Sequence, residues 1–259
     1  MAGSIIGGLL AAGSDAAQLR ASDPQPEHRE RLRAQGLTQL GSDNRAAAAG
    51  ADVVVLAVKP QILRAVCEDL APVLDEGQLV ISVAAGVPAA SLDRWLGARA
   101  VLLRCMPNTP ALLGAGATAL YAHGALDDTA RERAEHILGA VGRSCWVDDE
   151  SLLHAVTAVS GSGPAYFFLF MEAMVAGGER MGLDADTARM LCAQTCIGAG
   201  RMLAEGNADA AELRRRVSSP GGTTERAVAA LQAGGLDALV AAAMEACARR
   251  SRQMSDEFS

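Results

Sequence analysis

Val53–Val58, with the sequence VVVLAV, is a continuous apolar run that is closed by Lys59 and Pro60. Apolar runs of this kind, rich in β-branched residues, are typical of a parallel strand that is buried on both faces. Two further apolar runs follow, Leu79–Val83 and Ala100–Leu103, and each is closed by a turn that contains small residues or proline. Helical spacing fills the intervals between them. The alternation predicts a doubly wound α/β sheet, whose ligands bind beyond the carboxyl ends of the strands.

From about Asp148 onward, every segment shows the helical spacing of Leu, Ala, Val and Met, and no strand is expected. We therefore predict a dinucleotide-binding domain over residues 1–147 and an all-helical domain over residues 148–259. Several helices in the second domain are apolar on more than one face. This favours packing against a second copy of the chain, and a well-buried single-chain bundle is the alternative.

Composition excludes several classes of protein. A net charge of -7 over 259 residues argues against nucleic-acid binding. No apolar stretch reaches the ~18 residues of a membrane span, and no signal peptide is recognisable. The six cysteines and four histidines share no metal-ligand spacing, so we expect reduced thiols, no metal site and a cytoplasmic location. Lys59 is the only lysine.

The N-terminal segment differs from the usual start of a dinucleotide-binding fold. Met1–Ala12 has the spacing of a helix and Ala16–Ala21 that of a short strand. Such a fold normally opens with a strand and a glycine loop ahead of this helix. We therefore expect the chain to lack both, with Met1 and Ala2 at the last two positions of the glycine motif. A misassigned start or a trimmed chain would explain this, and a loss particular to this lineage is the alternative.

Two Gly-rich turns precede helices in the second half. Ser218–Thr224 (SSPGGTT) could form a neutral cradle for a small carboxylate from its backbone amides, a helix N-terminus and hydroxyl groups, or it could be a plain capped loop. Ser160–Tyr166 (SGSGPAY) is a weaker signal, because Gly and Ser before Pro often mark a helix start. No His or acid stands at a recognisable spacing from its serines, which argues against hydrolase chemistry.

Five segments in this order resemble pyrroline-5-carboxylate reductases: VVVLAVKPQ, ISVAAGV, RCMPNTP, VSGSGPAY and, most specifically, VSSPGGTTERAV. The resemblance implies an α/β Rossmann-like N-terminal domain followed by an all-α C-terminal dimerisation domain. It further implies a homodimer, with a higher homo-oligomer such as a decamer as an alternative. The implied activity is the reduction of pyrroline-5-carboxylate to proline by a nicotinamide cofactor.

The resemblance also assigns roles to individual residues. The substrate would be held by the SPGGTT loop, with Thr224 facing the imine nitrogen as the catalytic hydroxyl, and by a residue near the substrate entrance; these positions are Glu150, Ser219, Gly221, Gly222, Thr223 and Thr224. The cofactor would contact positions around the adenosine ribose and at the strand ends, which are Met1, Ala2, Ser22, Pro24, Asn44, Val58, Lys59, Ala85, Met106, Pro107 and Asn108.

Asp23 leaves the choice of cofactor open. Its carboxylate could bind a ribose 2′-hydroxyl and favour NADH, whereas Ser22 and Arg29 could receive the 2′-phosphate of NADPH. We expect NADPH, with NADH also used.

Two rival readings remain. A hydroxyacid dehydrogenase has the same two-domain plan but needs a lysine in its helical domain, and no lysine follows Lys59. A truncated, non-catalytic paralogue that keeps the helical dimer would explain the missing first strand, but the intact SPGGTT loop argues against it.

Overall fold

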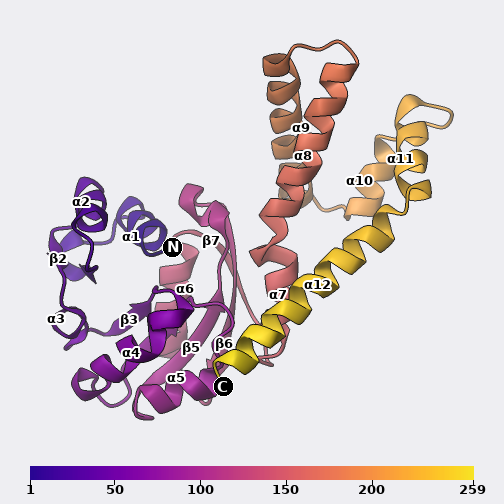
Figure 1. Ribbon diagram of the computed structural model, residues 1–259. Coiled ribbons are helices and arrows are strands. Elements are labelled where there is room, and N and C mark those ends of the chain that lie inside the picture. Colours follow the sequence, from indigo (N-terminus) through magenta and orange to yellow (C-terminus); the bar gives the residue numbers. More distant parts are fainter. The chain divides into compact units, whose positions relative to one another are not determined.

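In the computed structural model, which describes residues 1–259, the chain divides into two compact units. One joins Met1–Pro164 with Ala246–Ser259, and the other is Ala165–Glu245. All strands lie in the first unit: β1 (Arg20–Ser22), β2 (Gln39–Gly41), β3 (Val53–Leu56), β4 (Leu79–Ser82), β5 (Val101–Met106), β6 (Gly116–His123) and β7 (Gly142–Trp146) (Figure 1). The predicted boundary after residue 147 stays a prediction.

The helices of the first unit are α1 (Ala2–Ala11), α2 (Pro26–Ala34), α3 (Asn44–Ala48), α4 (Pro60–Leu70), α5 (Ala89–Trp95), α6 (Asp128–Gly139) and α7 (Leu152–Val156). Two helices continue from one unit into the other, α8 (Gly163–Arg180) and α12 (Leu236–Glu257). Those of the second unit alone are α9 (Ala185–Glu205), α10 (Ala210–Arg216) and α11 (Thr223–Ala233). Short 3-10 turns occur at Ala16–Gln18, Ala71–Val73 and Thr109–Leu113, and a π-helical turn at Thr157–Gly161 joins α7 to α8.

The main sheet has the order β3-β4-β5-β6-β7. The first three strands are parallel, β6 runs antiparallel to β5, and β7 is parallel to β6. The predicted apolar runs therefore form adjacent parallel strands, and β4 is buried at all four of its residues. The fold of the α/β half is confirmed.

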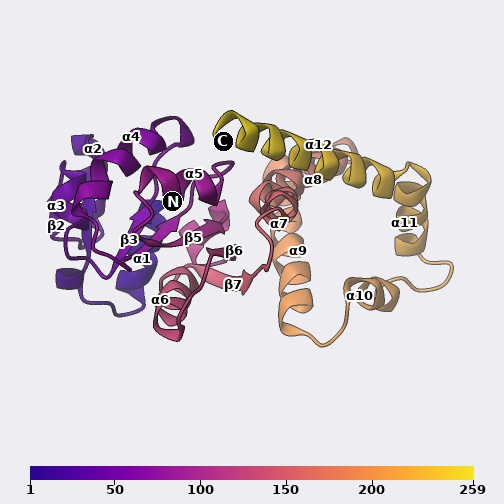
Figure 2. The ribbon, with the colours of Figure 1, turned by 90° about the horizontal axis from the view of Figure 1, so that it is seen from below.

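Helices cover both faces of this sheet, as Figure 2 shows with α4 and α6 on opposite sides of the strands. Val80 packs with Leu63 of α4 and Leu92 of α5 in one core cluster. Its neighbour Ile81 packs with Leu138 of α6 in the other cluster, which also includes residues of α1. Successive residues of β4 thus enter opposite cores, as the two-residue period of a strand requires.

The N-terminal helix is confirmed, but the strand expected at Ala16–Ala21 begins only at Arg20. Its first residues form a 3-10 turn instead, because the Asp15 carboxylate accepts a hydrogen bond from the Ala17 amide at 2.8 Å. β1 pairs only with β2, in a separate two-stranded sheet, and no strand leads into α1.

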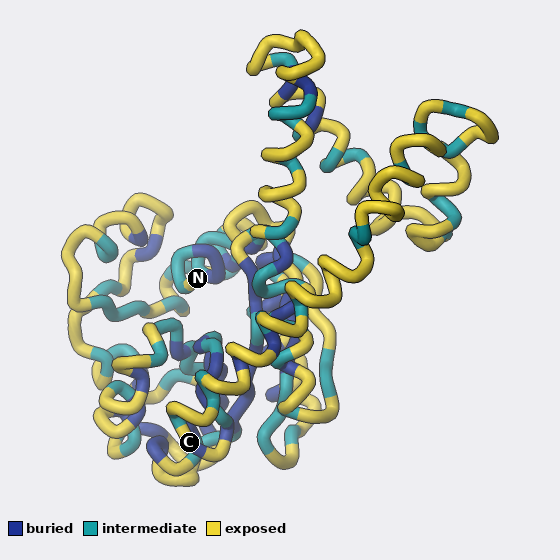
Figure 3. Tube along the Cα trace, turned by 45° about the vertical axis from the view of Figure 1, so that its right-hand side comes forward, coloured by how far each residue is buried: buried dark blue, intermediate teal, exposed yellow.

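The second unit contains helices only, and much of its apolar surface is exposed (Figure 3). On α8, Phe167 and Leu169 are 64% and 68% exposed. The helical stretch Leu152–Arg180 is long and apolar enough to pass for a membrane span, and the bent pair α11–α12 would be a second candidate. Length and composition alone do not separate a membrane span from a helix that packs against another protein chain.

Candidate active site

Ser22 and Asn44, both predicted to contact the cofactor, lie side by side. The Ser22 hydroxyl donates a hydrogen bond to Asn44 Oδ1 at 2.5 Å. Asn44 does not cap its helix, because Asp43 accepts the hydrogen bonds from the Arg45 and Ala46 amides. Both side chains line a cavity that continues along β1 and β3. They are therefore available to a ligand at the end of β1.

The carboxylate of Asp23, the residue beside Ser22, is already engaged. It accepts a hydrogen bond from the Gln25 amide at 2.8 Å and lies 3.0 Å from His28 Nδ1. The Arg29 guanidinium donates to the Asp23 carbonyl oxygen at 2.5 Å. These contacts form the turn at Pro24, so Ser22 does not close it. They hold a cation next to the Ser22–Asn44 pair.

The other predicted cofactor positions of this half lie on two elements. Ala2 lines the same cavity at the start of α1, whose N-cap, Met1, makes no side-chain capping bond. Val58 lines it beyond β3, and Lys59 is the N-cap of α4, again without a side-chain capping bond. The structure thus brings Ala2, Ser22, Asn44 and Val58 to one cavity.

Ala85 and Met106 line a second, small cavity of about 10 Å³, at the carboxyl ends of β4 and β5. Gly86 follows Ala85 with a φ of 76°, in the left-handed region that favours glycine. A Cβ on Gly86 would also lie 2.9 Å from Met254 Cβ, so glycine is required on both counts. Burial raises the pKa of Cys105 on β5 to about 12, so this cysteine remains a thiol.

Asn108 uses both ends of its amide to fix the loop after β5. Its Nδ2 donates to the Ser160 carbonyl at 3.0 Å, and its Oδ1 accepts from the Ala117 amide at 2.9 Å. Pro107 beside it is buried. Asn108 thereby connects the loop both to β6 and to the π-helical turn that contains Ser160. The first role of its side chain is to position the Met106–Asn108 segment.

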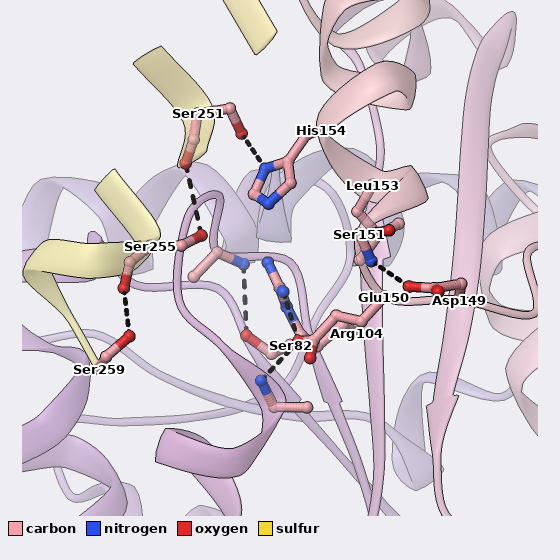
Figure 4. Close-up of polar contacts among 12 residues, drawn as sticks. Ser82, Arg104, Asp149, Glu150, Ser151, Leu153, His154, Ser251, Ser255 and Ser259 are labelled. Atoms are coloured by element: carbon pink, nitrogen blue, oxygen red, sulfur yellow. Dashed lines mark hydrogen bonds and ion pairs between the residues drawn. The ribbon is translucent and has the colours of Figure 1, made fainter. Parts of the chain in front are cut away.

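Glu150, predicted near the substrate entrance, lies in a partly buried polar cluster (Figure 4). Its Oε1 accepts from Arg104 Nη1 at 2.6 Å and from the Ala89 amide, at the start of α5, also at 2.6 Å. The Arg104 side chain is 7% exposed, and its Nε has no partner. Glu150 therefore connects β5 to α5 and to the start of the helical segment, and its partner Arg104 lines the same small cavity as Ala85 and Met106.

His154, four residues after Glu150, makes a separate contact, with its Nδ1 2.8 Å from the Ser251 hydroxyl of α12 (Figure 4). Burial lowers the pKa of His154, and the charges of Arg104 and Arg252 lower it further, against the opposing effect of Glu150 and Asp256. Neither Arg104 nor His154 is among the predicted site residues. No local motif could have indicated them, because their partners lie 46 and 97 residues away in the chain.

The Ser218–Thr224 segment connects α10 to α11. The Gly222 amide donates to the Ser219 carbonyl at 2.9 Å, and the Gly221 amide donates to the Glu225 carboxylate at 2.7 Å. Gly221 has a φ of 71°, so its glycine is needed for the turn.

No hydroxyl group closes α11. Its N-cap is Gly222, without any side-chain capping bond, and the structure gives the hydroxyls of Ser219, Thr223 and Thr224 no hydrogen-bond partner. The capped-loop alternative therefore does not describe this segment, and its hydroxyls are free to bind a ligand.

Two family models match the chain. The pyrroline-5-carboxylate reductase dimerisation family matches residues 150–254, and the coenzyme F420-dependent NADP oxidoreductase family matches residues 1–86. The first match covers the helices with exposed apolar faces, in agreement with the predicted packing between copies. The chain is thus a homo-oligomer-forming protein of the nicotinamide oxidoreductase type.

Individual relatives are similar to this chain along its whole length. A pyrroline-5-carboxylate reductase of Pseudomonas aeruginosa is 51% identical over 258 residues, which cover 100% of this chain and 94% of the relative. The structure of a pyrroline-5-carboxylate reductase from Coxiella burnetii superposes with a TM-score of 0.93 at 41% identity, over 97% of this chain and 94% of the other. The NADP-bound pyrroline carboxylate reductase of Plasmodium falciparum gives 0.85 at 26% identity, over 97% and 93%. On this fold, this site and these matches, the chain belongs to the pyrroline-5-carboxylate reductase family.

Proposed function

We propose that the chain reduces 1-pyrroline-5-carboxylate to L-proline with NADPH, the last step of proline biosynthesis. The observation that carries this proposal is the free polar lining of the Ser218–Thr224 loop, on a chain that resembles these reductases from end to end. Full-length similarity to enzymes also argues against the non-catalytic paralogue.

The loop suits a small anionic substrate. Amides at the N-terminus of α11 carry partial positive charge, and Ser219 and Thr223 add hydroxyl donors without adding a cation. Gly221 and Gly222 let the backbone approach the substrate closely. A substrate whose single carboxylate is held this way keeps its ring in a fixed orientation, which is the main contribution a protein can make to a hydride transfer.

Thr224 is the residue that would face the ring nitrogen. Its hydroxyl has no partner in the structure and can accept a hydrogen bond from a protonated imine. A hydroxyl is a poor proton source at neutral pH, so the substrate binds already protonated or takes its proton from water. Thr224 then orients the iminium and stabilises its charge until the carbon accepts hydride.

The residues proposed to bind the cofactor belong to the first unit. A bound nicotinamide cofactor supplies the hydride, and this chain's residues hold its two ends. Ser22, Asn44 and the nearby Arg29 offer two polar groups and a cation for a 2′-phosphate, whereas the Asp23 carboxylate is occupied by Gln25 and His28. This supports NADPH over NADH as the preferred donor.

The ends of the parallel strands would receive the nicotinamide half. Val58 and Lys59 follow β3, Ala85 follows β4, and the Met106–Asn108 segment follows β5. Pro107 and Asn108 are held by burial and by the amide contacts of Asn108. Glu150, through Arg104 and the Ala89 amide, fixes the same strand ends. We assign it a positioning role on the substrate side of this loop.

We further propose that the active form is a homodimer built on residues 148–259. Exposed apolar side chains such as Phe167 and Leu169 would be buried between the two copies.

The test is NADPH oxidation by the purified chain with pyrroline-5-carboxylate, followed at 340 nm. Proline should form in step with NADPH loss, and 3-hydroxyisobutyrate with NADP should give no reaction. Folded dimers that are silent with pyrroline-5-carboxylate would overturn the proposal in favour of the non-catalytic paralogue.

A further inference from the structure

The last turns of α12 belong to the α/β unit rather than to the helical one. Ala246–Ser259 forms one compact unit with Met1–Pro164. Ser251 is buried in this unit, and Phe258 packs against the core cluster that contains Leu92 of α5. The end of α12 therefore packs on the same unit that carries the predicted cofactor positions.

Met254, in this part of α12, covers the turn that follows β4. A Cβ on Gly86 would lie 2.9 Å from Met254 Cβ and 3.3 Å from Met254 Cε. Two carbons at opposite ends of the methionine side chain thus lie close to one backbone position, so the side chain is folded over Gly86. Gly86 is buried and Met254 is half-buried. The contact joins the end of α12 directly to the backbone beside Ala85.

Packing holds this turn in place, because its backbone has no hydrogen bonds of its own. The structure gives the backbone amides and carbonyls of Ala85, Gly86 and Val87 no hydrogen-bond partner. The nearest backbone amides that donate a hydrogen bond to a side chain are those of Ala84 and Ala89. A segment without backbone hydrogen bonds takes its conformation from the atoms that pack on it. At Gly86, these atoms belong to Met254.

Two contacts on the same side of α12 fix the position of Met254. Three residues before it, the Ser251 hydroxyl lies 2.8 Å from His154 Nδ1 (Figure 4). Four residues after it, Phe258 packs against the core cluster of the sheet. Residues three and four positions apart lie on the same side of a helix. Met254 is thus held between two anchored neighbours and cannot leave Gly86 unless the end of α12 moves.

We infer that Met254 is a positioning residue for the nicotinamide half of the cofactor. Through its contact with Gly86, it holds the Ala85–Gly86 turn in the conformation to which the nicotinamide binds. The inference rests on the proposed function, in which Ala85 lies against that half of the cofactor. Because a preformed turn does not have to be ordered on binding, the contact raises the affinity for any ligand that carries a nicotinamide.

The two halves of the cofactor should respond differently when the Met254 side chain is shortened. Ser22 and Asn44, proposed for the adenosine end, line a different cavity from that of Gly86. NADPH and NADH carry the same nicotinamide, so both should bind more weakly. The fragment 2′-phospho-ADP-ribose lacks the nicotinamide and should bind as before. A general loosening of the unit would weaken the binding of all three ligands.

The test measures Kd for these three ligands by isothermal titration calorimetry on the full chain. Met254→Ala removes the outer atoms of the side chain, including the Cε beside Gly86, and should raise Kd for NADPH and NADH by about 5- to 10-fold. Kd for 2′-phospho-ADP-ribose should stay within about twofold. Met254→Leu conserves the side-chain volume and should return Kd for NADPH to within about twofold of the unsubstituted chain. If Met254→Ala does not fold, Met254→Val, which also lacks Cε, takes its place.

An unchanged Kd for NADPH in the truncated variant would overturn the inference, as would an equal rise for 2′-phospho-ADP-ribose. None of these measurements uses pyrroline-5-carboxylate. A chain that shows the expected differences in Kd but does not reduce pyrroline-5-carboxylate would therefore overturn the proposed function and leave the role of Met254 in place.

Discussion

Arg104 Nη1 and Glu150 Oε1 meet at 2.6 Å, and the same carboxylate oxygen accepts the Ala89 amide at 2.6 Å. One oxygen thus connects β5, the start of α5 and the segment that leads into the helical unit. Removing one member of a buried ion pair leaves the other without compensation.

Glu150→Ala should lower the free energy of unfolding by about 3 kcal/mol, because Arg104 would keep a buried, unpaired charge. Urea denaturation at pH 7 measures this. The matched control is Glu30→Ala, which removes the exposed Arg33–Glu30 pair and should cost less than about 1 kcal/mol. Equal losses in the two variants would show that the Arg104–Glu150 contact contributes nothing beyond a surface pair.

His154 makes the free energy of unfolding depend on pH. Its pKa in the folded protein is lowered from 6.5 by burial and by the charges of Arg104 and Arg252, against Glu150 and Asp256. The contribution of neutral His154 to the free energy of unfolding is therefore fully present above pH 6.5. It is lost as the pH falls from there through the lower pKa of the folded state.

The His154→Gln variant should flatten this loss below pH 6.5, because it has no proton to gain on unfolding. Denaturation of both proteins at a series of pH values checks it. A slope that His154→Gln leaves unchanged would assign the loss to other groups.

Alanine substitutions at Gly86 and Gly77 distinguish the cost of steric crowding from the cost of backbone strain. Gly86→Ala meets Met254 Cβ at 2.9 Å and also forces alanine to a φ of 76°. Gly77→Ala has the same strain at a φ of 77° but nothing within 4 Å of the new Cβ. We expect Gly77→Ala to cost about 1 kcal/mol and Gly86→Ala about 1–3 kcal/mol more, by urea denaturation. Equal losses would mean that Met254 moves aside freely.

Thr224→Ala should lower kcat by about 10- to 100-fold, the value of one hydrogen bond to a charged group. Thr224→Ser keeps the hydroxyl and should stay close to the unsubstituted chain. Steady-state NADPH oxidation with pyrroline-5-carboxylate distinguishes the two, after circular dichroism has shown that both are folded. An alanine variant with an unchanged rate would remove this hydroxyl from the reaction.

The Ser22–Asn44 pair should set the choice of cofactor. Ser22→Ala removes the donor of the 2.5 Å bond and, on the proposed function, one ligand for the 2′-phosphate. KM for NADPH should rise by about 10-fold, while KM for NADH, which has no such phosphate, changes little. An equal rise in KM for both cofactors would show that Ser22 contacts a part of the molecule that NADPH and NADH share.

The sequence predicted the parallel strands β3, β4 and β5, because each contains an apolar run, and in β4 that run is buried at every residue. It did not predict β6 or β7. Gly116–His123 and Gly142–Trp146 mix small, polar and aromatic residues, and their extended form comes from pairing with β5 and with each other. Tertiary pairing of this kind leaves little local signal.

The residues of the candidate site were also predictable from the sequence only in part. Residues that act within one loop, such as Ser219 and Thr224, were recognisable because their motif is contiguous. The contact of Ser22 with Asn44 spans 22 residues and that of His154 with Ser251 spans 97. Glu150 was identified, but its ion pair with Arg104 was not, because only the folded sheet brings the two together.

In the proposed homodimer, the exposed apolar side of α8 makes the free energy of unfolding depend on protein concentration. Residues such as Phe168, which is 58% exposed in the single chain, would be protected only while the two copies stay associated. Unfolding of such a dimer is coupled to its dissociation, so the equilibrium depends on protein concentration. Each tenfold dilution lowers the free energy of unfolding of the dimer by about 1.4 kcal/mol. The cell therefore sets the lifetime of each chain partly through the number of copies it makes.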